Sequence, residues 1–242
     1  MSQWQQLEIS GVRVDVFEPE GAIRFGLMFL RDYEQTSPVG NAHFFRLLQE
    51  HRLACAAPVA GRTFWTERRG DGFHATMSAS QHVVEHCLPW MLSRWALGPR
   101  GVAIAGEGIG GQGALRLSFL HPNLFPVVAA IAPSVEFQEW YNADTPLQEM
   151  YDSKEQCRQD TASLHIHPTE FPPHIFFCSN RAQPHWWRGG DRLHEKLAAL
   201  GIGHTVDLQS RADQPRDYFE RMWPAAMRFL IGGLEKESRR LV

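Results

Sequence analysis

The segment from Gly101 to Phe125 constrains the fold of this chain more than any other, because it joins an apolar run, a glycine-rich turn and a helical pattern. Residues 102–105 are a short apolar run bounded by glycines, which is typical of a buried parallel strand. Residues 112–120 have the apolar spacing of a helix, and the turn between, 106–111, reads Gly-Glu-Gly-Ile-Gly-Gly. This order predicts a strand, a sharp turn and a helix that packs back on a sheet.

Strand and helix patterns alternate along the rest of the chain. The opening residues alternate polar and apolar side chains like a first strand. Alternation of this kind predicts an α/β fold, with a mainly parallel sheet and helices on both faces. We expect strands at 12–17, 25–30, 53–57, 102–105, 127–131, 174–178 and 204–208, and helices at 41–51, 82–96, 112–120, 188–200 and 218–230.

Length and composition favour one domain. The 242 residues are 43% hydrophobic, and the sequence shows no repeat or linker, so a single core is expected over 1–242. The stretch of about 135–173 has many polar and aromatic residues and no clear strand, so we expect a cap-like, irregular insertion there.

Charge and cysteine usage exclude several classes of partner. A formal net charge of −3 leaves no basic footprint for nucleic acid. No apolar run approaches the roughly 20 residues that cross a bilayer, and the opening residues lack the pattern of a signal peptide. Four widely spaced cysteines are therefore expected to be reduced thiols in a cytoplasmic protein, and neither a membrane nor a cofactor is expected. They are Cys55, Cys87, Cys157 and Cys178.

The glycine turn also fits the frame of a known catalytic motif. In the nucleophile elbow of α/β-hydrolases, G-x-S-x-G, small residues flank a serine in a strained turn between strand and helix. Here the frame falls on Gly106, Gly108 and Gly110, so glycine stands at the serine position. The chain resembles the esterase D group of α/β-hydrolases, which includes S-formylglutathione hydrolases and related carboxylesterases. The segments that carry the resemblance are 110–115, 121–122, 132–134, 172–178, 191–200 and 217–230.

The resemblance implies an α/β-hydrolase fold in which the Ser-His-Asp triad positions have been replaced. The serine position is Gly108. The acid is expected in the turn 179–184, where Ala182 stands, and the histidine in 211–216, where Gln214 stands; neither segment contains the residue type required. The family's oxyanion loop carries a histidine-glycine pair, whereas this chain has Arg31, Asp32 and Tyr33.

Replacement at all three triad positions and in the oxyanion loop favours a protein that has lost serine-esterase chemistry. Removing the serine or the histidine alone costs about 10⁶-fold in rate in a serine protease, so nothing retains the other members once one is gone. We therefore expect an inactive esterase homologue with no intact catalytic residue, which binds a small-molecule ligand or a protein partner. A homo-oligomer is compatible with this reading. A serine at position 108 should lower thermal stability, because the elbow conformation favours glycine.

Three alternatives remain open from the sequence. The chain could be an active carboxylesterase-type hydrolase with a non-standard site, for example with water activated by Glu107. It could bind a nucleotide, since 106–111 also matches G-x-G-x-x-G and Glu136 follows the next strand. His165 and His167, with Asp160 or Glu170, could chelate a metal, but no H-E-x-x-H motif occurs and no metal is expected.

Aromatic residues indicate where a ligand would bind. Trp140 and Tyr141 follow the strand after the elbow helix, Trp186 and Trp187 follow the altered acid turn, and Tyr33 lies in the oxyanion loop. All should lie near the carboxyl ends of the strands, where open α/β sheets bind ligands. The pocket is expected to include Arg31, Asp32, Tyr33, Glu107, Gly108, Ile109, Trp140, Tyr141, Trp186 and Trp187.

Overall fold

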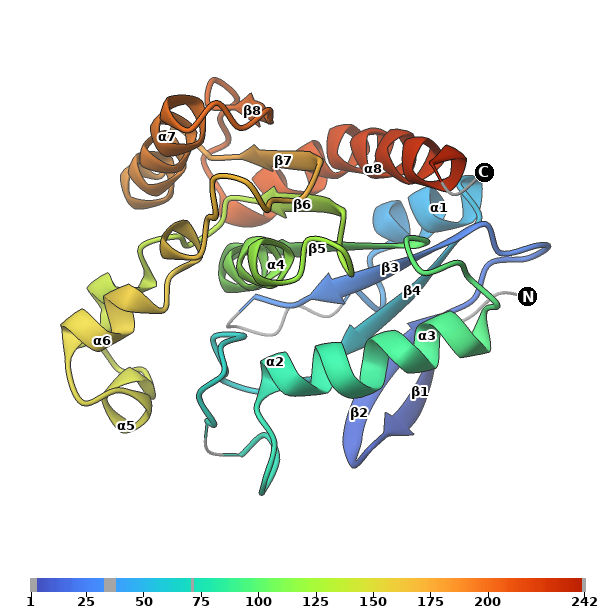
Figure 1. The fold of residues 1–242 in the computed structure, drawn as a ribbon, viewed down its shortest axis with the longest axis horizontal. Helices are drawn as coiled ribbons and strands as arrows, with labels where there is room; N and C mark the ends of the chain where they lie inside the picture. Colours follow the sequence, from blue (N-terminus) through green and yellow to red (C-terminus); the bar gives the residue numbers. More distant parts are fainter. Residues whose placement is uncertain (1–3, 33–37, 71, 241–242) are drawn as a thin grey trace.

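A computed structural model describes residues 4–32, 38–70 and 72–240. These residues form an eight-stranded sheet with the strand order β1-β2-β4-β3-β5-β6-β7-β8 (Figure 1). The strands are β1 (Trp4–Ile9), β2 (Val12–Phe17), β3 (Phe25–Leu30), β4 (Leu53–Pro58), β5 (Val102–Glu107), β6 (Val127–Ile131), β7 (His174–Cys178) and β8 (Thr205–Asp207).

The sheet is antiparallel at one edge and parallel elsewhere. β2 pairs antiparallel with β1 and with β4, whereas β4, β3, β5, β6, β7 and β8 run parallel. β5 lies between β3 and β6, with Leu30 opposite Gly106 and Ile131 opposite Glu107. The carboxyl ends of these three central strands therefore meet at the turn that follows β5.

Helices cover both faces of the sheet (Figure 1). α1 and α8 pack on one face, and the α2-η1-α3 segment, α4 and α7 pack on the other. The expected parallel sheet covered on both faces is thus confirmed. The helices are α1 (Ala42–Glu50), α2 (Ala79–Gln81), η1 (His82–Cys87), α3 (Leu88–Arg94), α4 (Gly108–Leu120), η2 (Phe137–Trp140), α5 (Leu147–Met150), α6 (Lys154–Gln159), η3 (Ala162–Leu164), α7 (Pro184–Ala199) and α8 (Pro215–Arg239).

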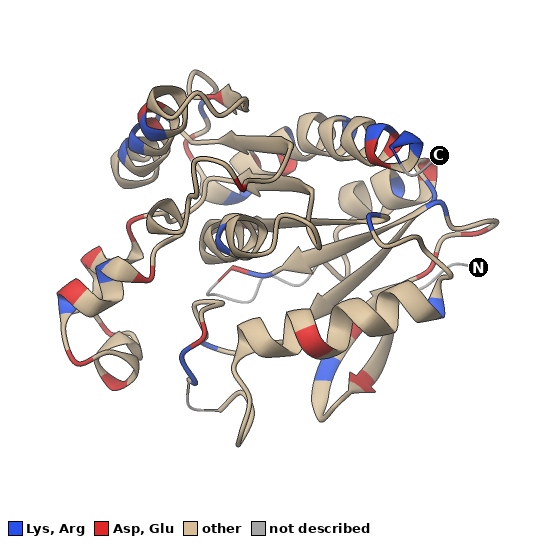
Figure 2. Cartoon of the chain, in the orientation of Figure 1, with Lys and Arg blue, Asp and Glu red and all other residues tan. Residues whose placement is uncertain are grey.

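The central strands are buried on both faces, so their apolar side chains alternate between two cores. In β3, Phe25, Leu27 and Phe29 belong to the core under α1 and α8, and Met28 and Leu30 belong to the opposite core. This explains why the central strands read as continuous apolar runs. Figure 2 shows acidic and basic residues mainly on helices and loops, with the central strands largely uncharged.

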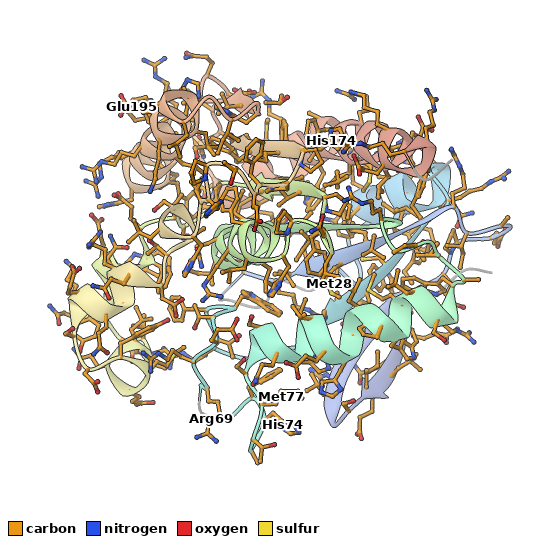
Figure 3. The ribbon with its side chains drawn as sticks, viewed as in Figure 1. Met28, Arg69, His74, Met77, His174 and Glu195 are labelled. Carbon is orange, nitrogen blue, oxygen red and sulfur yellow. The ribbon has the colours of Figure 1, made fainter. Side chains whose placement is uncertain are left out.

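Side chains fill the space between the layers and join distant elements (Figure 3). His174 at the start of β7 lies beside the last part of α8, where its Nε2 is 3.1 Å from Glu237 Oε1. The four cysteines are free and buried. Within the described ranges, no helix combines the length and apolar character needed to cross a membrane.

Four helical segments begin earlier than expected, including the α2-η1-α3 segment, which begins at Ala79 rather than at 82, and α8, which begins at Pro215 rather than at 218. α4 begins at Gly108 rather than at 112, because the glycines of the turn, which are poor helix formers, already have helical hydrogen bonding. α7 begins at Pro184 rather than at 188, with proline in the first turn, where its missing N–H costs nothing. The stretch 135–173, all of it described, contains short helices and no strand, as expected of an irregular insertion.

Candidate functional site

The turn after β5 has the backbone geometry of a nucleophile elbow. Gly108 has a φ of +52°, in the left-handed region that favours glycine. A Cβ atom on Gly110 would lie 2.5 Å from the Leu30 carbonyl carbon and 2.6 Å from Arg31 O, so only glycine fits there. These two glycines allow the amino end of α4 to lie directly against the end of β3.

The carboxylate of Asp32 occupies the space above Gly108. Asp32 lies two residues beyond the end of β3, and its Oδ1 accepts the Ile109 backbone N–H at 2.8 Å. A Cβ atom on Gly108 would lie 2.5 Å from Asp32 Cγ and 2.8 Å from Oδ2, and closer still to Oδ1. No side chain at position 108 is compatible with Asp32 in this place, because real Cβ contacts are not shorter than about 3 Å.

The residue before Asp32 anchors this loop to the sheet. Arg31 is 5% exposed, forms an ion pair with Asp15 of β2 and donates to Ala57 O of β4 at 3.1 Å. The Arg31 carbonyl accepts the Trp65 indole N–H at 3.0 Å. Arg31, an expected pocket residue, therefore lies behind the site and positions Asp32. Its guanidinium is held by Asp15, and it does not line the cleft described below.

The Asp32 carboxylate occupies a backbone N–H that an oxyanion hole would use. In α/β-hydrolases the N–H of the residue after the nucleophile belongs to the oxyanion hole, and here that N–H, on Ile109, is bound to a carboxylate. An oxyanion could bind this N–H only if the Asp32 carboxylate moved away, and losing one oxyanion donor costs about 3 kcal/mol.

An amide bridge links the two loops where the acid and the histidine of the triad were sought. Asn180, which follows β7, is fully buried. Its Nδ2 donates to Ala212 O at 2.7 Å, and its Oδ1 accepts the N–H groups of Ala182 and Ala212 at 3.0 and 3.1 Å. Asn180 and Arg181, rather than Ala182, are thus the side chains of this turn that reach the loop after β8, and Asn180 is the buried one. Gln214 is the exposed residue preceding α8, at the edge of a cleft.

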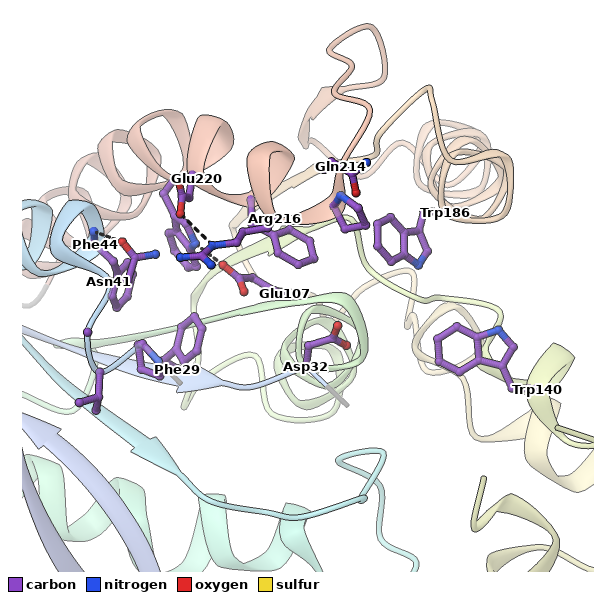
Figure 4. A pocket seen from close by; sticks show the side chains of 16 residues that line it. Phe29, Asp32, Asn41, Phe44, Glu107, Trp140, Trp186, Gln214, Arg216 and Glu220 are labelled. Atoms are coloured by element: carbon purple, nitrogen blue, oxygen red, sulfur yellow. Dashed lines mark hydrogen bonds and ion pairs between the residues drawn. The ribbon is translucent and has the colours of Figure 1, made fainter. Parts of the chain in front are cut away.

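A cleft of about 790 Å³ opens beside Asp32 and Glu107, at the carboxyl ends of β3 and β5 (Figure 4). Its walls come from β3, α1, the insertion, α7 and α8, and six of its side chains are aromatic. The lining residues are Phe29, Asp32, Pro38, Val39, Gly40, Asn41, Phe44, Glu107, Trp140, Trp186, Gln214, Pro215, Arg216, Phe219, Glu220 and Trp223.

Glu107 is a buried carboxyl group in the wall of this cleft. It is 7% exposed, and its Oε1 accepts the indole N–H of Trp223 on α8. Burial raises the pKa of Glu107 to about 7, the Trp223 hydrogen bond opposes the shift, and the charges of Asp32 and Glu220 add to it. Glu107 therefore exchanges its proton near neutral pH.

The cleft brings together four of the expected pocket residues: Asp32, Glu107, Trp140 and Trp186. Gly108 and Ile109 lie directly beneath Asp32 and contact its carboxylate rather than the cleft. Tyr33 lies outside the described residues.

Two expected aromatic residues point elsewhere. The Tyr141 hydroxyl donates to Tyr151 O at 3.0 Å, within the insertion. The Trp187 indole donates to Leu208 O at 3.1 Å, in the loop after β8. Neither of these expected pocket residues lines the cleft, because each side chain hydrogen-bonds a backbone carbonyl elsewhere.

The sequence reasoning missed the wall that α8 contributes. Phe219 and Trp223 are four residues apart, as are Arg216 and Glu220, so each pair lies on one face of the helix. That spacing was the available signal. Phe29, Asn41 and Phe44 were also missed; Phe29 and Phe44 lie 5.6 and 4.7 Å, ring to ring, from Trp223.

The structure gives the other motif residues packing roles. Gly110 is required by the close approach to β3, and the N–H that would hold a phosphate is bound to Asp32. Glu136 pairs with Arg188 and Arg192. These contacts account for the glycine motif without a nucleotide.

The histidines of the insertion do not form a metal-binding group with their acidic neighbours. His165 Nε2 lies 3.4 Å from Asp160 Oδ1, and that carboxylate also binds Arg116 and the Tyr151 hydroxyl. In the part of the chain that the structure describes, no group of three or more His, Cys, Asp or Glu is placed to hold a metal ion.

Several solved structures share this fold. The fluorophosphonate-binding serine hydrolase FphF of Staphylococcus aureus superposes with a TM-score of 0.79 at 13% identity, over 96% of this chain and 98% of that one. An S-formylglutathione hydrolase from Agrobacterium tumefaciens superposes with a TM-score of 0.69 at 17% identity, over 95% of this chain and 94% of that one. A ferulic acid esterase superposes with a TM-score of 0.70 at 15% identity, over 97% of this chain and 98% of that one. No protein-family model and no curated protein sequence matches the chain.

Proposed function

We propose that this chain, which has the α/β-hydrolase fold, binds a small organic molecule in its cleft and does not perform serine-type ester hydrolysis. One observation carries the proposal. The Asp32 carboxylate accepts the Ile109 N–H and fills the space above Gly108 where a nucleophile and an oxyanion would have to stand.

The cleft itself supports a binding role. Its volume of about 790 Å³ lies within the range of about 300 to 1,000 Å³ that is usual for small-molecule sites. Aromatic walls with a few polar groups are also typical of such sites. Trp140, Trp186 and Trp223 all line it, so occupancy should change the intrinsic fluorescence.

Two assays test the proposal on the purified protein. A fluorophosphonate probe should leave it unlabelled while labelling an active serine hydrolase in the same tube. Hydrolysis of p-nitrophenyl acetate and butyrate should stay at the level of albumin and free imidazole controls. Stoichiometric labelling, or turnover far above those controls, would sink the proposal.

A second candidate is hydrolysis by a water molecule that Glu107 activates. A carboxylate whose pKa is about 7 suits a general base at neutral pH, and Glu107 lines the cleft. If ester turnover is found, Glu107→Gln should abolish it, while Glu195→Gln, on the exposed side of α7, should not (Figure 3). Turnover that survives Glu107→Gln would exclude this route.

A further inference from the structure

Resting on the proposed binding role, we propose that the ligand is an organic cation: a protonated amine on an apolar body, with its ammonium group between Asp32 and Glu107. Both carboxylates line the cleft, and the aromatic side chains around them would cover the body of such a ligand (Figure 4). The inference thus names the chemical class of the ligand.

The charges of the lining favour a cation. Asp32, Glu107 and Glu220 are acidic, and Arg216 is the single lysine or arginine among the described lining residues. Arg216 is 84% exposed on the side chain and donates to Glu220 Oε1 at 3.3 Å, so these two offset one another at the rim. Asp32 and Glu107 add two further acidic side chains to the lining.

The hydrogen bonding of Glu107 leaves an acceptor for the ligand. Among the described residues, Trp223 is the one donor to this carboxyl group, and it binds Oε1. Oε2 belongs to a side chain that is only 7% exposed and that lines the cleft. Burial and the nearby charges of Asp32 and Glu220 raise the pKa of Glu107 to about 7, and an ammonium group beside Oε2 would favour ionisation instead.

The aromatic walls suit the same ligand. The cleft is lined by Phe29, Phe44, Trp140, Trp186, Phe219 and Trp223. Aromatic rings attract ammonium groups to their faces and bury apolar carbon on all sides. The same walls and carboxylates disfavour phosphates and carboxylates, because no unpaired cation is available among the described lining residues to bind them.

The test uses three probes of similar shape that differ in charge: 2-phenylethylammonium, 2-phenylethanol and 3-phenylpropanoate. Each is titrated into the wild-type protein at pH 6 and pH 8, with tryptophan fluorescence and calorimetry as readouts. The ammonium probe should bind at least about tenfold more tightly than the alcohol at pH 8, and the carboxylate probe should not bind. The affinity of the ammonium probe should fall about fivefold to tenfold at pH 6, where Glu107 holds its proton.

Variants assign the effect to Glu107. Glu107→Gln keeps an oxygen for the Trp223 N–H but removes the charge, so it should lose both the preference for the ammonium probe and the pH dependence. Glu195→Gln, exposed on α7, should keep both. An unchanged circular dichroism spectrum and a cooperative melting transition above the assay temperature would show that each variant is folded.

The outcomes separate this inference from the proposed function. If the alcohol or the carboxylate binds as tightly as the ammonium probe, the cation inference is overturned and a binding role remains. The absence of saturable ammonium binding, or full binding by Glu107→Gln, also overturns it. Fluorophosphonate labelling or ester turnover removes the proposed function instead, whatever the probes do.

Discussion

Gly108→Ala is the substitution for which the structure predicts the clearest loss of stability. An alanine at φ +52° costs about 1 to 2 kcal/mol. Its Cβ would also displace the Asp32 carboxylate from the Ile109 N–H, and losing such a charge-assisted hydrogen bond costs about 1.5 to 3 kcal/mol. The expected total is about 4 kcal/mol, or roughly 10 °C in melting temperature for a chain of this length.

A matched glycine separates the two contributions. Gly201 has a φ of +70° and no heavy atom within 4 Å of an added Cβ, so Gly201→Ala reports the backbone cost alone, about 1 to 2 kcal/mol. Urea unfolding of both variants, and of Gly108→Ala in an Asp32→Ala background, gives the coupling energy, expected at about 2 kcal/mol. Equal losses at positions 108 and 201, or no coupling to Asp32, would refute the assigned geometry.

Three further predictions concern stability. Glu107 has a pKa of about 7 in the folded state, against about 4.5 in an unfolded chain. Its contribution to the free energy of unfolding is therefore full below pH 4.5 and is lost as the pH rises through 7. Glu107→Gln should remove about 3 kcal/mol of this pH dependence, measured by urea unfolding at pH 5 and pH 8, and an unchanged pH profile would contradict the prediction. Asn180→Ala should cost about 2 to 3 kcal/mol, because a fully buried side chain with three hydrogen bonds is lost; a loss under about 0.5 kcal/mol would mean that water replaces the bridge. Asp15→Ala should lower the free energy of unfolding by about 3 to 5 kcal/mol, because the Arg31 guanidinium stays buried without its carboxylate. Changing both Asp15 and Arg31 to leucine should recover part of that loss, as measured by urea unfolding.

The strands were predictable because buried parallel strands have a strong local signal. The parallel strands β3, β6 and β7 begin and end at the expected residues. So does the antiparallel β2, whose polar and apolar side chains alternate, whereas β1 was not assigned its own residue range. The carboxyl end of α8 was not predictable in the same way, because the helix continues past two glycines, 232–233, and its last five residues are polar or charged. Helix length there is decided by tertiary contacts, such as those of Glu237 with Arg100 and His174.

The candidate site was predictable from the sequence only in part, because its contacts also join residues that are distant in the chain. The positive φ of Gly108 follows from the turn motif, and Asp32, Glu107, Trp140 and Trp186 follow from the rule about strand ends. The contact of Asp32 with the Ile109 N–H joins residues 77 positions apart, and that of Trp223 with Glu107 joins residues 116 apart. No local sequence pattern predicts such contacts. The sequence therefore indicated Asp32 and Glu107 as pocket residues but did not indicate which residues they contact.

The overlap between position 108 and Asp32 also restricts how this sequence can change. A nucleophile cannot enter at Gly108 while Asp32 is present, and removing Asp32 first leaves the Ile109 N–H without its acceptor. Each single step therefore loses stability before the pair gains anything. The two positions are neighbours in space but far apart in the chain, so the order of substitution matters. Any route that places a serine at position 108 would have to pass through a less stable intermediate.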